Sequence, residues 1–341
     1  MAETLTNQQW LYVQRPDGRV GAKHYRLHTE ALLPALAEGE VLLASRYISV
    51  DPYMRIQQSS GKTWEAPHPL GTVQGAGVVG QVLASRYPGL NEGDWVQAYS
   101  GWQRFAKLHG SALTRLDPDV APVTTALHVL GMPGRTAWFG LMEAGQPKPG
   151  ETVVVSGAAG AVGSLVVQFA KKAGCRVVAI AGSAEKLRWL RDELRADQVL
   201  NYRELADANA LASALDALNV KVDIYFDNVG GWISDAVLSR INLRGRMIIC
   251  GQMSQYQGGL DKPEYGPRLL HHLLFQRARI EGILARDFSH RMPEMVARVA
   301  PWLRDGSLKY RETIREGFEL LPRALAELFD STGSGKVLVK V

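Results

Sequence analysis

Short apolar runs, separated by polar turn residues, fill the first part of the chain. The runs occupy residues 41–44, 47–50, 77–83 and 95–99, and a turn signal of Asn, Gly and Asp at 91–94 precedes the last of them. Runs of this length between turn residues are typical of short β-strands. The pattern over roughly the first 130 residues therefore favours a compact, irregular barrel rather than βαβ units.

From about Gly131 the pattern changes to strands and helices in alternation. Apolar β-branched runs predict strands, and amphipathic stretches between them predict helices. The predicted strands are 153–155, 175–181, 198–202, 222–227, 246–250 and 279–284, and the predicted helices are 136–144, 164–172 and 184–194. Strands and helices that take turns along a chain form a parallel, doubly wound sheet, so the predicted fold class is α/β.

The last part of the chain has a third pattern. Residues 294–305 and 321–330 predict amphipathic helices, and residues 335–341 predict a final strand that packs back onto the first domain. A length of 341 residues suggests two domains. We therefore expect a β-rich domain at residues 1–130, a parallel-sheet domain at 131–304 and a C-terminal return to the first domain at 305–341.

A glycine-rich turn connects the first strand of the second domain to its helix. The spacing is G-x-x-G-x-x-G, and the residues expected to contact a cofactor are Ala159, Gly160, Ala161, Val162 and Gly163. The backbone would pass close to a pyrophosphate here, and the N–H groups that open the helix would face the phosphates. Such spacing also occurs in ordinary turns, but the flanking strand and helix favour a dinucleotide site.

The end of the next strand distinguishes NAD from NADP. Enzymes that use NAD usually carry an acidic residue there, roughly 20 residues after the glycines, which binds the ribose hydroxyls. Here the strand is followed by Gly182 and Ser183, the first acidic residue is Glu185 in the next helix, and Lys186 follows it. We therefore expect NADPH. The alternative is that Lys186 is a surface residue and that Glu185 still contacts the ribose.

Two further segments should lie at the same edge of the sheet, because the carboxyl ends of parallel strands meet there. Asn228 follows the strand at 222–227 and is a candidate contact to a ribose, or else an Asx-turn residue with local hydrogen bonds only. The next strand leads into Cys250, Gly251 and Gln252. A glycine at this point permits close approach of the nicotinamide half.

The composition is that of an ordinary globular protein. Hydrophobic residues make up 46% of the chain and charged residues 21%, and the apolar runs are too short to span a bilayer. The N-terminus lacks the basic and apolar regions of a signal peptide, and two cysteines argue against a disulfide framework, so we expect a cytoplasmic protein. The net charge of +5 is scattered, and we expect neither nucleic acid nor membrane as a partner.

No metal site is expected. No cysteine precedes Cys175, so the ligands that a zinc alcohol dehydrogenase needs are missing, and His68 and His109 are expected to be surface or turn residues. Hydride transfer without a metal needs an acceptor that is already activated, such as a quinone or a C=C bond conjugated to a carbonyl. Hydride addition at the β-carbon moves charge onto an enolate oxygen, which needs a hydrogen-bond donor.

Several motifs, in order along the chain, resemble one family. They are the run Asp-Pro-Tyr-Met-Arg at 51–55, residues 129–137, 156–163, 181–186, 226–231, 250–256 and 308–312, and the late Gly-Lys at 335–336. Together they are similar to the zinc-independent medium-chain dehydrogenases/reductases, in the branch of leukotriene B4 12-hydroxydehydrogenase, prostaglandin reductase and curcumin reductase. The resemblance runs nearly end to end. It implies a GroES-like catalytic domain, a Rossmann domain, NADPH as cofactor and reduction of enones.

The resemblance also implies roles for individual residues. Lys186 would contact the 2′-phosphate, Tyr202 the adenosine half, and Asn228 a ribose. The segments at 250–256 and 282–288 would surround the nicotinamide, and their candidate contacts are Cys250, Gly251, Gln252, Tyr256, Ile283, Leu284 and Ala285. The aromatic candidates for the substrate pocket are Tyr53, Tyr99, Trp102 and Tyr256. Tyr256 and Tyr53 are the candidate donors to the enolate, although a tyrosine can equally be a half-buried packing residue.

The chain departs from the family near its end. Where the family commonly carries Asn, two residues before the late Gly-Lys, this chain has Gly333. A side-chain contact to the cofactor is lost there unless Ser334 or Thr332 replaces it, and Lys336 remains.

Two other functions stay open at this point. A quinone reductase would share the fold and the cofactor. An NADPH-binding sensor or RNA-binding protein without turnover is supported only by the basic charge. The family also implies a homodimer, in which the strand at 279–284 is a sheet edge available for pairing across a two-fold axis.

Overall fold

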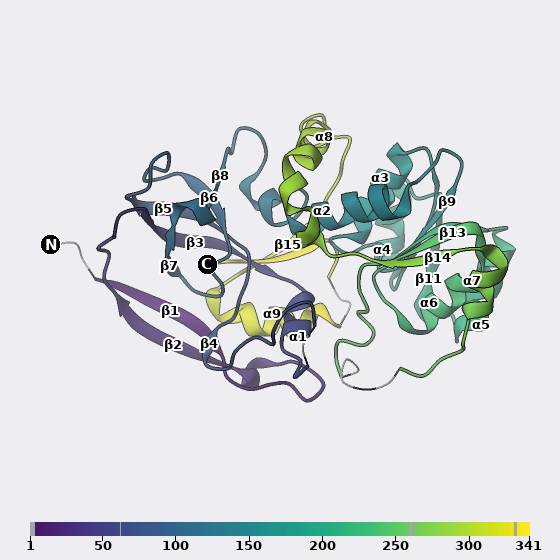
Figure 1. Ribbon diagram of the computed structural model, residues 1–341, viewed down its shortest axis with the longest axis horizontal. Helices are drawn as coiled ribbons and strands as arrows, with labels where there is room; N and C mark the ends of the chain where they lie inside the picture. Colours follow the sequence, from purple (N-terminus) through teal and green to yellow (C-terminus); the bar gives the residue numbers. More distant parts are fainter. Residues whose placement is uncertain (1–3, 62, 259–261, 263, 331–332) are drawn as a thin grey trace. The chain divides into compact units, whose positions relative to one another are not determined.

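The computed structural model describes residues 4–61, 63–258, 262, 264–330 and 333–341. Contacts divide the chain into two compact units, which Figure 1 colours along the sequence. The first comprises Met1–Leu127, Tyr256–Lys262 and Glu312–Val341, and the second His128–Gln255 and Pro263–Arg311. The predicted division at residues 130 and 304 stays a prediction, because a dense set of contacts is not a test of independent folding.

The first unit is built from β-strands. Its larger sheet has the order β15-β16-β3-β5-β6-β8, with β7 also paired to β3, and a smaller sheet has the order β2-β1-β4. The strands are β1 (Leu5–Tyr12), β2 (Tyr25–Leu32), β3 (Glu40–Val50), β4 (Thr72–Val73), β5 (Val78–Ser85), β6 (Trp95–Ala98), β7 (Phe105–His109), β8 (Thr114–Leu116), β15 (Glu312–Glu316) and β16 (Lys336–Lys340). Two short helices, α1 (Tyr53–Gln57) and α9 (Leu321–Leu328), belong to the same unit. The predicted strands at 41–44 and 47–50 form one continuous strand, β3.

A buried ion pair fixes β16 to the segment that leads into α1. β16 runs antiparallel to β3 and pairs Val337 with Val50. Lys336 Nζ lies 3.0 Å from Asp51 Oδ1 and donates to the carbonyl of Val50 at 2.8 Å. Burial lowers the pKa of Lys336, and the charge of Asp51 acts in the opposite direction. Loss of either partner would leave an uncompensated buried charge, so the pair holds the start of α1, and with it Tyr53, against the C-terminal strand.

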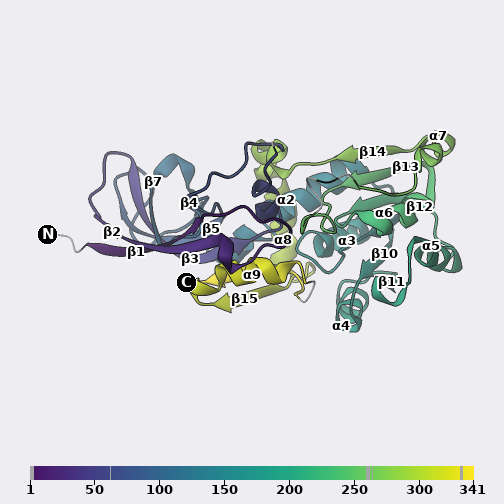
Figure 2. The same cartoon turned by 90° about the horizontal axis from the view of Figure 1, so that it is seen from below.

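Parallel strands form the centre of the second unit (Figure 2). Among the described residues the order is β11-β10-β9-β12-β13-β14, and each neighbouring pair is parallel. The strands are β9 (Thr152–Val155), β10 (Arg176–Ala181), β11 (Gln198–Asn201), β12 (Val222–Asp227), β13 (Ile241–Ile249) and β14 (Arg279–Gly282). This is the Rossmann order, which reverses direction between the first and fourth strands, here β9 and β12. The predicted α/β fold class, with a β-rich part and a doubly wound parallel sheet, is confirmed.

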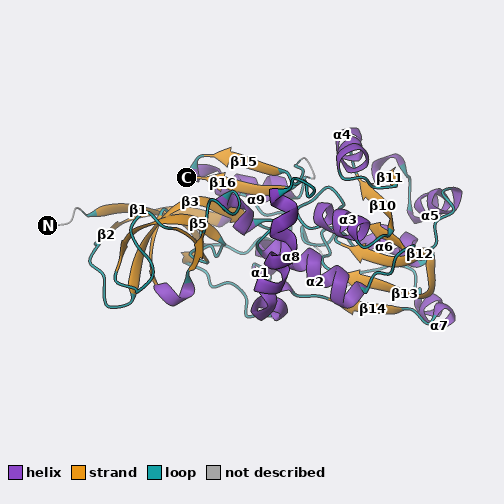
Figure 3. Cartoon of the chain, turned by 90° about the horizontal axis from the view of Figure 1, so that it is seen from above, coloured by secondary structure: helices purple, strands orange, loops and turns teal. Residues whose placement is uncertain are grey.

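Helices α3 to α7 connect these strands, and α2 and α8 lie before the first strand and after the last one in the chain (Figure 3). They are α2 (Met132–Phe139), α3 (Gly163–Lys172), α4 (Ala184–Arg188), α5 (Ala208–Ala217), α6 (Gly231–Leu238), α7 (Leu270–Gln276) and α8 (Met292–Arg304). The helices predicted at 136–144 and 184–194 each change to a wider π-helix along their length, from α2 to η4 (Gly140–Gly145) and from α4 to η5 (Trp189–Glu193). The strand predicted at 198–202 ends at Asn201, because Tyr202 begins the 3-10 turn η6 (Tyr202–Glu204).

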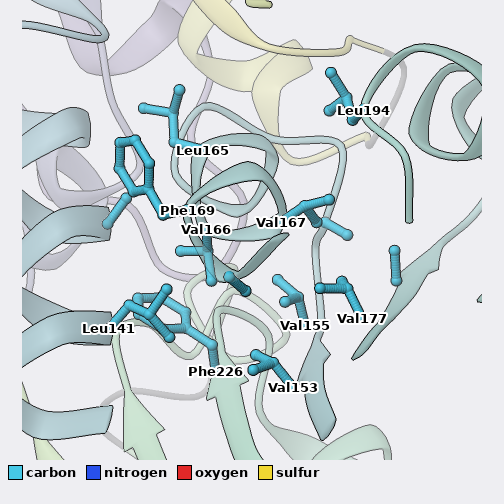
Figure 4. Packing of buried hydrophobic residues seen from close by; sticks show 14 of the residues in the cluster. Leu141, Val153, Val155, Leu165, Val166, Val167, Phe169, Val177, Leu194 and Phe226 are labelled. Carbon is cyan, nitrogen blue, oxygen red and sulfur yellow. The ribbon is translucent and has the colours of Figure 1, made fainter. Parts of the chain in front are cut away.

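Both faces of the parallel sheet are covered, because successive strand residues point to opposite sides. On one face Val153 and Val155 of β9 join Leu165 and Phe169 of α3 in a single core (Figure 4). On the other face Val154 packs in a cluster with apolar residues of α5 and α6. A strand buried on both faces needs apolar residues at every position, which explains the continuous run of valines in the sequence.

Candidate functional site

The turn that follows β9 requires its glycines. Gly157 has a φ of +57°, in the left-handed region that favours glycine. A Cβ on Gly163 would lie 2.4 Å from the carbonyl oxygen of Gly157 and 2.8 Å from the Cα of Ala158. A Cβ on Gly160 would meet the same Gly157 oxygen at 3.2 Å, which is tight but less severe. The spacing seen in the sequence therefore lets the first turn of α3 pack directly on the turn after β9.

The start of α3 offers N–H groups to an anion. The described residues of the second unit provide no acceptor for the N–H groups of Val162 and Gly163. These groups lie at the positive end of the dipole of a helix of 10 residues. A glycine turn that opens a helix after the first strand of a Rossmann sheet is the arrangement that binds a pyrophosphate. The predicted contact residues Ala159, Gly160 and Ala161 belong to the same turn.

Asp227, at the end of β12, joins three strand ends. It is completely buried. Its carboxylate accepts hydrogen bonds from Tyr225 (2.8 Å), Ser156 (2.9 Å), the N–H groups of Val229 (2.9 Å) and Gly230 (3.0 Å), Ser234, and Gln252 (3.4 Å). Its backbone carbonyl accepts from the N–H groups of Cys250 and Gly251 at 2.9 and 3.1 Å. Asp227 is not among the predicted site residues, although an acidic residue at the end of a buried strand is a usable signal.

Asn228 is held by a long-range contact. Its amide Nδ2 donates to the carbonyl of Ser156 at 2.8 Å, and its backbone N–H donates to the hydroxyl of Ser156 at 3.1 Å. Because Ser156 precedes the glycine turn, Asn228 is tied to the turn after β9, and its hydrogen bonds are not only local. The Asn228 side-chain oxygen has no donor among the described residues, so it can accept from a ribose hydroxyl.

Tyr202 covers Gly182 at the end of β10. The parallel register places Ala181 opposite Asn201, so the residues after both strands come together. A Cβ on Gly182 would lie 2.7 Å from Cε1 of Tyr202 and 2.9 Å from its hydroxyl oxygen. The structure thus brings together two residues predicted to bind the adenosine half.

Two cations lie beside this position. Burial lowers the pKa of Lys186, and the nearby positive charge of Arg203 lowers it further. The guanidinium of Arg203 also lies 6.0 Å from the ring centroid of Tyr202. Ser183 caps α4 by accepting from the N–H of Lys186 at 3.3 Å. Neighbouring cations suit a dianionic phosphate. Arg203 is not among the predicted site residues, and its only signal in the sequence is its place directly after Tyr202.

Glu185 is the acidic residue that could have replaced a strand-end carboxylate. Its side chain is 75% exposed and lies 3.7 Å from Arg311. An exposed carboxylate paired with an arginine gives no support to the alternative in which Glu185 holds the ribose.

The segment after β13 is fixed by Asp227. Cys250 and Gly251 bind the backbone of Asp227 as described, and Gln252 packs on Gly230, where a Cβ would lie 2.3 Å from its Oε1. Burial and the charge of Asp227 raise the pKa of the Cys250 thiol to about 12. A raised pKa disfavours the thiolate, which is the reactive form of a cysteine.

The segment after β14 is anchored in the core. Ile283 donates its N–H to Ile249 at 3.1 Å, and its side chain is buried. Leu284 follows, and Ala285 opens the 3-10 helix η7 (Ala285–Arg291). This helix is held by Phe288, whose ring stacks on Phe139 of α2 with centroids 4.7 Å apart. Of the predicted nicotinamide segments at 250–256 and 282–288, residues 250–255 and 282–288 thus belong to the second unit.

Tyr256, in contrast, belongs to the first unit. It is buried, and the neighbouring Gln257 accepts the N–H of Val20 at 3.0 Å. Tyr53, in α1, is half-buried and belongs to the same unit. Burial raises the pKa of Tyr53 well above its ordinary value, and the charge of Asp51 and the neighbouring Tyr99 act in the same direction.

Tyr99 lines a cavity of about 390 Å³ in the first unit. The other lining residues are Gln57, Glu65, Ala66, Pro67, His68 and Pro69. The side chain of Tyr99 is 58% exposed, and a Cβ on Gly75 would lie 2.7 Å from its hydroxyl. The hollow is mostly apolar and open, with a tyrosine hydroxyl beside it.

Trp102 and Gly333 differ from the other candidates. Trp102 is completely buried in the core of the first unit, with its ring centroid 5.0 Å from that of Tyr25, so the structure does not bring it to the cavity. Among the described residues, a Cβ on Gly333 would meet only Val337, at 3.8 Å. The structure thus has room for a side chain at position 333, but glycine provides none that could contact the cofactor. Thr332, an alternative contact, lies outside the described residues.

Two family models match the chain. The one described as the N-terminal domain of oxidoreductase matches residues 8–116, and the one described as zinc-binding dehydrogenase matches residues 161–301. A Bacillus subtilis (strain 168) relative, named as an NADP-dependent oxidoreductase (YfmJ), is 42% identical over 338 residues, covering 99% of this chain and 98% of the relative. The NADPH-dependent curcumin reductase of Escherichia coli (strain K12) is 38% identical over 338 residues, with coverages of 98% and 97%. The chain belongs to the medium-chain dehydrogenase/reductase family.

Other members of this family are also similar over their full length. The 2-alkenal reductase (NADP(+)-dependent) of Nicotiana tabacum is 36% identical over 346 residues, covering 100% of this chain and 99% of the relative. The crystal structure of CurA from Vibrio vulnificus in complex with NADPH has a TM-score of 0.90 and 37% identity, covering 98% of this chain and 99% of that one. The resemblance drawn from the sequence motifs is confirmed.

The residues of this family member fit NADPH. Gly163 lets the first turn of α3 pack closely on the turn after β9, and the N–H groups of Val162 and Gly163 have no acceptor among the described residues of their unit. Lys186 and Arg203 supply positive charge beside the Gly182 position. The donor set therefore matches both a pyrophosphate and a 2′-phosphate.

The described residues hold no group of three or more His, Cys, Asp or Glu side chains placed to bind a metal ion. His109 is exposed and bonds Ser111, and His68 bonds the carbonyl of Val73 at 3.0 Å. Within the part of the chain that the structure describes, no helix is long and apolar enough to cross a bilayer.

Substitution of the third glycine tests the turn. We expect Gly163→Ala to raise the dissociation constant for NADPH about tenfold or more, because its Cβ would strike two backbone atoms at once. Gly21→Ala is the matched control, since a Cβ there meets nothing within 4 Å. Fluorescence titration with NADPH measures both variants. Equal affinities for both variants and the wild type would contradict the assignment of the turn.

Proposed function

We propose that this reductase uses NADPH to reduce the C=C bond of α,β-unsaturated ketones and aldehydes, with hydride transfer to the β-carbon. The observation that carries the proposal is the similarity over nearly the whole chain to a 2-alkenal reductase and a curcumin reductase. Conjugation to the carbonyl already activates such a C=C bond, so the acceptor needs no metal. Bound NADPH would supply the hydride.

In this proposal the second unit holds the cofactor. The turn at Ala159–Gly163 binds the pyrophosphate, Lys186 and Arg203 bind the 2′-phosphate beside Tyr202, and Asn228 accepts from a ribose hydroxyl. The segments at 250–255 and 282–288 line the nicotinamide. The rigid bonds to Asp227 support this assignment, because they fix the strand ends from which these segments start.

The first unit provides the hydrogen-bond donor for the enolate. Tyr53 keeps its proton at neutral pH, since burial and the charge of Asp51 raise its pKa. A protonated tyrosine stabilises a developing oxyanion by donating a hydrogen bond. Tyr256 is the second candidate for this role, and Tyr99 is a candidate substrate contact at the cavity. Trp102 is not proposed as a substrate contact, because it has no exposed surface.

A quinone reductase remains the second enzymatic candidate, because it would use the same fold and cofactor. We expect a simple enone, such as methyl vinyl ketone, to have a higher kcat/KM than a simple quinone, such as benzoquinone, in side-by-side NADPH oxidation assays.

The tyrosine variants test the proposed donor to the enolate. We expect Tyr53→Phe or Tyr256→Phe to lower kcat on the enone about a hundredfold, with unchanged NADPH affinity. Faster turnover of the quinone, or full activity of both variants, contradicts the proposal. NADPH binding without any turnover would favour the sensor.

The positive charges of Lys186 and Arg203 should make the protein prefer NADPH over NADH. We expect Lys186→Ala and Arg203→Ala each to raise the KM for NADPH about tenfold, while the KM for NADH changes little, because only NADPH carries the 2′-phosphate. Arg191→Ala is the control, since Arg191 is exposed and paired with Asp192. Steady-state kinetics with both cofactors measures the effect. An equal rise for NADPH and NADH would show that the two cations do not select the phosphate.

We also propose a homodimer that forms at the free edge of the parallel sheet. Every residue of β14 is exposed, and it is the last strand in the sheet order. Beside it, α7 exposes Leu270 (70%), Leu274 (72%) and Phe275 (65%). An edge strand next to an apolar helix face is self-complementary across a two-fold axis, so a second copy of this chain is the occupant that fits.

The oligomeric state in solution tests whether β14 and α7 form the proposed dimer interface. Light scattering after size exclusion should give twice the chain mass of 37.4 kDa for the wild type. Leu274→Asp should give the monomer mass, because it places a charge on the apolar face. Leu33→Asp, which changes an exposed leucine of the first unit, should stay dimeric. A monomeric wild type, or a dimeric Leu274→Asp, refutes the proposed interface.

A further inference from the structure

A buried histidine contacts the phosphate-binding turn. His128 is the first residue of the second unit and is completely buried. Its Nε2 lies 3.2 Å from the carbonyl oxygen of Ala161, in the middle of the glycine turn. A carbonyl oxygen only accepts, so Nε2 carries the hydrogen and donates it.

The support beneath this histidine is rigid. The backbone carbonyl of His128 accepts the N–H groups of Gly131 and Gly134 at 3.1 and 3.0 Å. A Cβ on Gly134 would lie 1.8 Å from the carbonyl oxygen of Val129, so the chain folds tightly on itself at the start of α2. The imidazole also packs edge-on against Tyr310, with ring centroids 5.8 Å apart. His128 is therefore a fixed donor.

The direction of the Ala161 carbonyl sets the direction of the next N–H. In a planar trans peptide the C=O of one residue and the N–H of the following residue point in opposite directions. His128 holds the Ala161 carbonyl on the side toward α2. The N–H of Val162 consequently points away from His128, and it has no acceptor among the described residues of its unit.

We infer that His128 is a positioning residue for the cofactor: its hydrogen bond to Ala161 turns the N–H of Val162 toward the pyrophosphate. The inference rests on the proposed NADPH site and assigns a role to a residue outside it. The carbonyls of Gly160 and Val162 still accept the N–H groups of Ser164 and Val166 without this hydrogen bond, but the Ala161–Val162 peptide between them is held less firmly. NADPH must then order it on binding, at a cost in affinity.

Two substitutions separate the hydrogen bond from simple packing. His128→Gln keeps an N–H donor at the reach of Nε2, whereas His128→Leu fills space without a donor. We expect His128→Leu to raise the NADPH dissociation constant about five- to tenfold and His128→Gln to change it less than about twofold. His290→Leu, at an exposed histidine of the same unit, is the matched control and should behave as the wild type.

A second ligand makes the test specific to the pyrophosphate. The probe 2′-AMP carries the 2′-phosphate but no pyrophosphate, so its affinity should be the same in the wild type and in His128→Leu. Equilibrium titration of NADPH and 2′-AMP, together with thermal melting, provides readouts that do not depend on turnover. Equal NADPH affinities in all variants overturn the inference. An equal loss for both ligands, or the same loss in His128→Gln, assigns His128 a structural role and overturns it as well.

A failure of the role inferred for His128 can be distinguished from a failure of the proposed function. If the wild type does not bind NADPH, the proposed function itself fails. If the wild type binds NADPH and His128→Leu binds it equally well, only the role of His128 fails. Should His128→Leu not fold, His128→Asn serves instead, because its shorter amide cannot reach Ala161, and it should show the same selective loss.

Discussion

The buried carboxylate of Asp227 is the interaction on which the cofactor side of this protein depends. It lies at the point where the strand order of the parallel sheet reverses, between β9 and β12, and it gathers donors from the ends of β9, β12 and the loop after β13. A buried carboxylate is tolerated only when hydrogen bonds replace its water, and here they do. The carboxylate holds Ser156 before the glycine turn, and the backbone carbonyl of the same residue holds Cys250 and Gly251 at the start of the nicotinamide segment, so one residue sets the position of both.

The sequence predicted the parts of this arrangement that depend on local pattern. The continuous valines of β9 and the glycines after them identified the strand, the turn and α3, because burial on both faces and tight packing leave a local signature. Lys186 was predicted because the strand before it ends without an acid. Asp227, Arg203 and His128 escaped prediction because their partners lie far from them along the chain, after other strands of the sheet. Arg203, for example, comes near Lys186 only through the parallel register of β10 and β11.

The substrate side was less predictable, and for a physical reason. Aromatic residues carry no local sign of whether they fill a core or face a cavity. Trp102 and Tyr99 were equal candidates in the sequence, yet Trp102 packs on Tyr25 with no exposed surface while Tyr99 lines an open hollow. Tyr256 follows the nicotinamide segment in sequence but belongs to the other compact unit. Such differences arise from how distant strands meet, which a pattern along one chain does not record.

The position to which hydride is transferred distinguishes reduction of the C=C bond from reduction of the carbonyl. The enzyme would be incubated with an enone and NADPH that carries deuterium at the transferable position of the nicotinamide, and the product examined by NMR. We expect a saturated ketone with deuterium on the former β-carbon. Deuterium on the carbonyl carbon of an unsaturated alcohol would contradict this expectation, because the enzyme would then reduce the carbonyl and not the conjugated C=C bond.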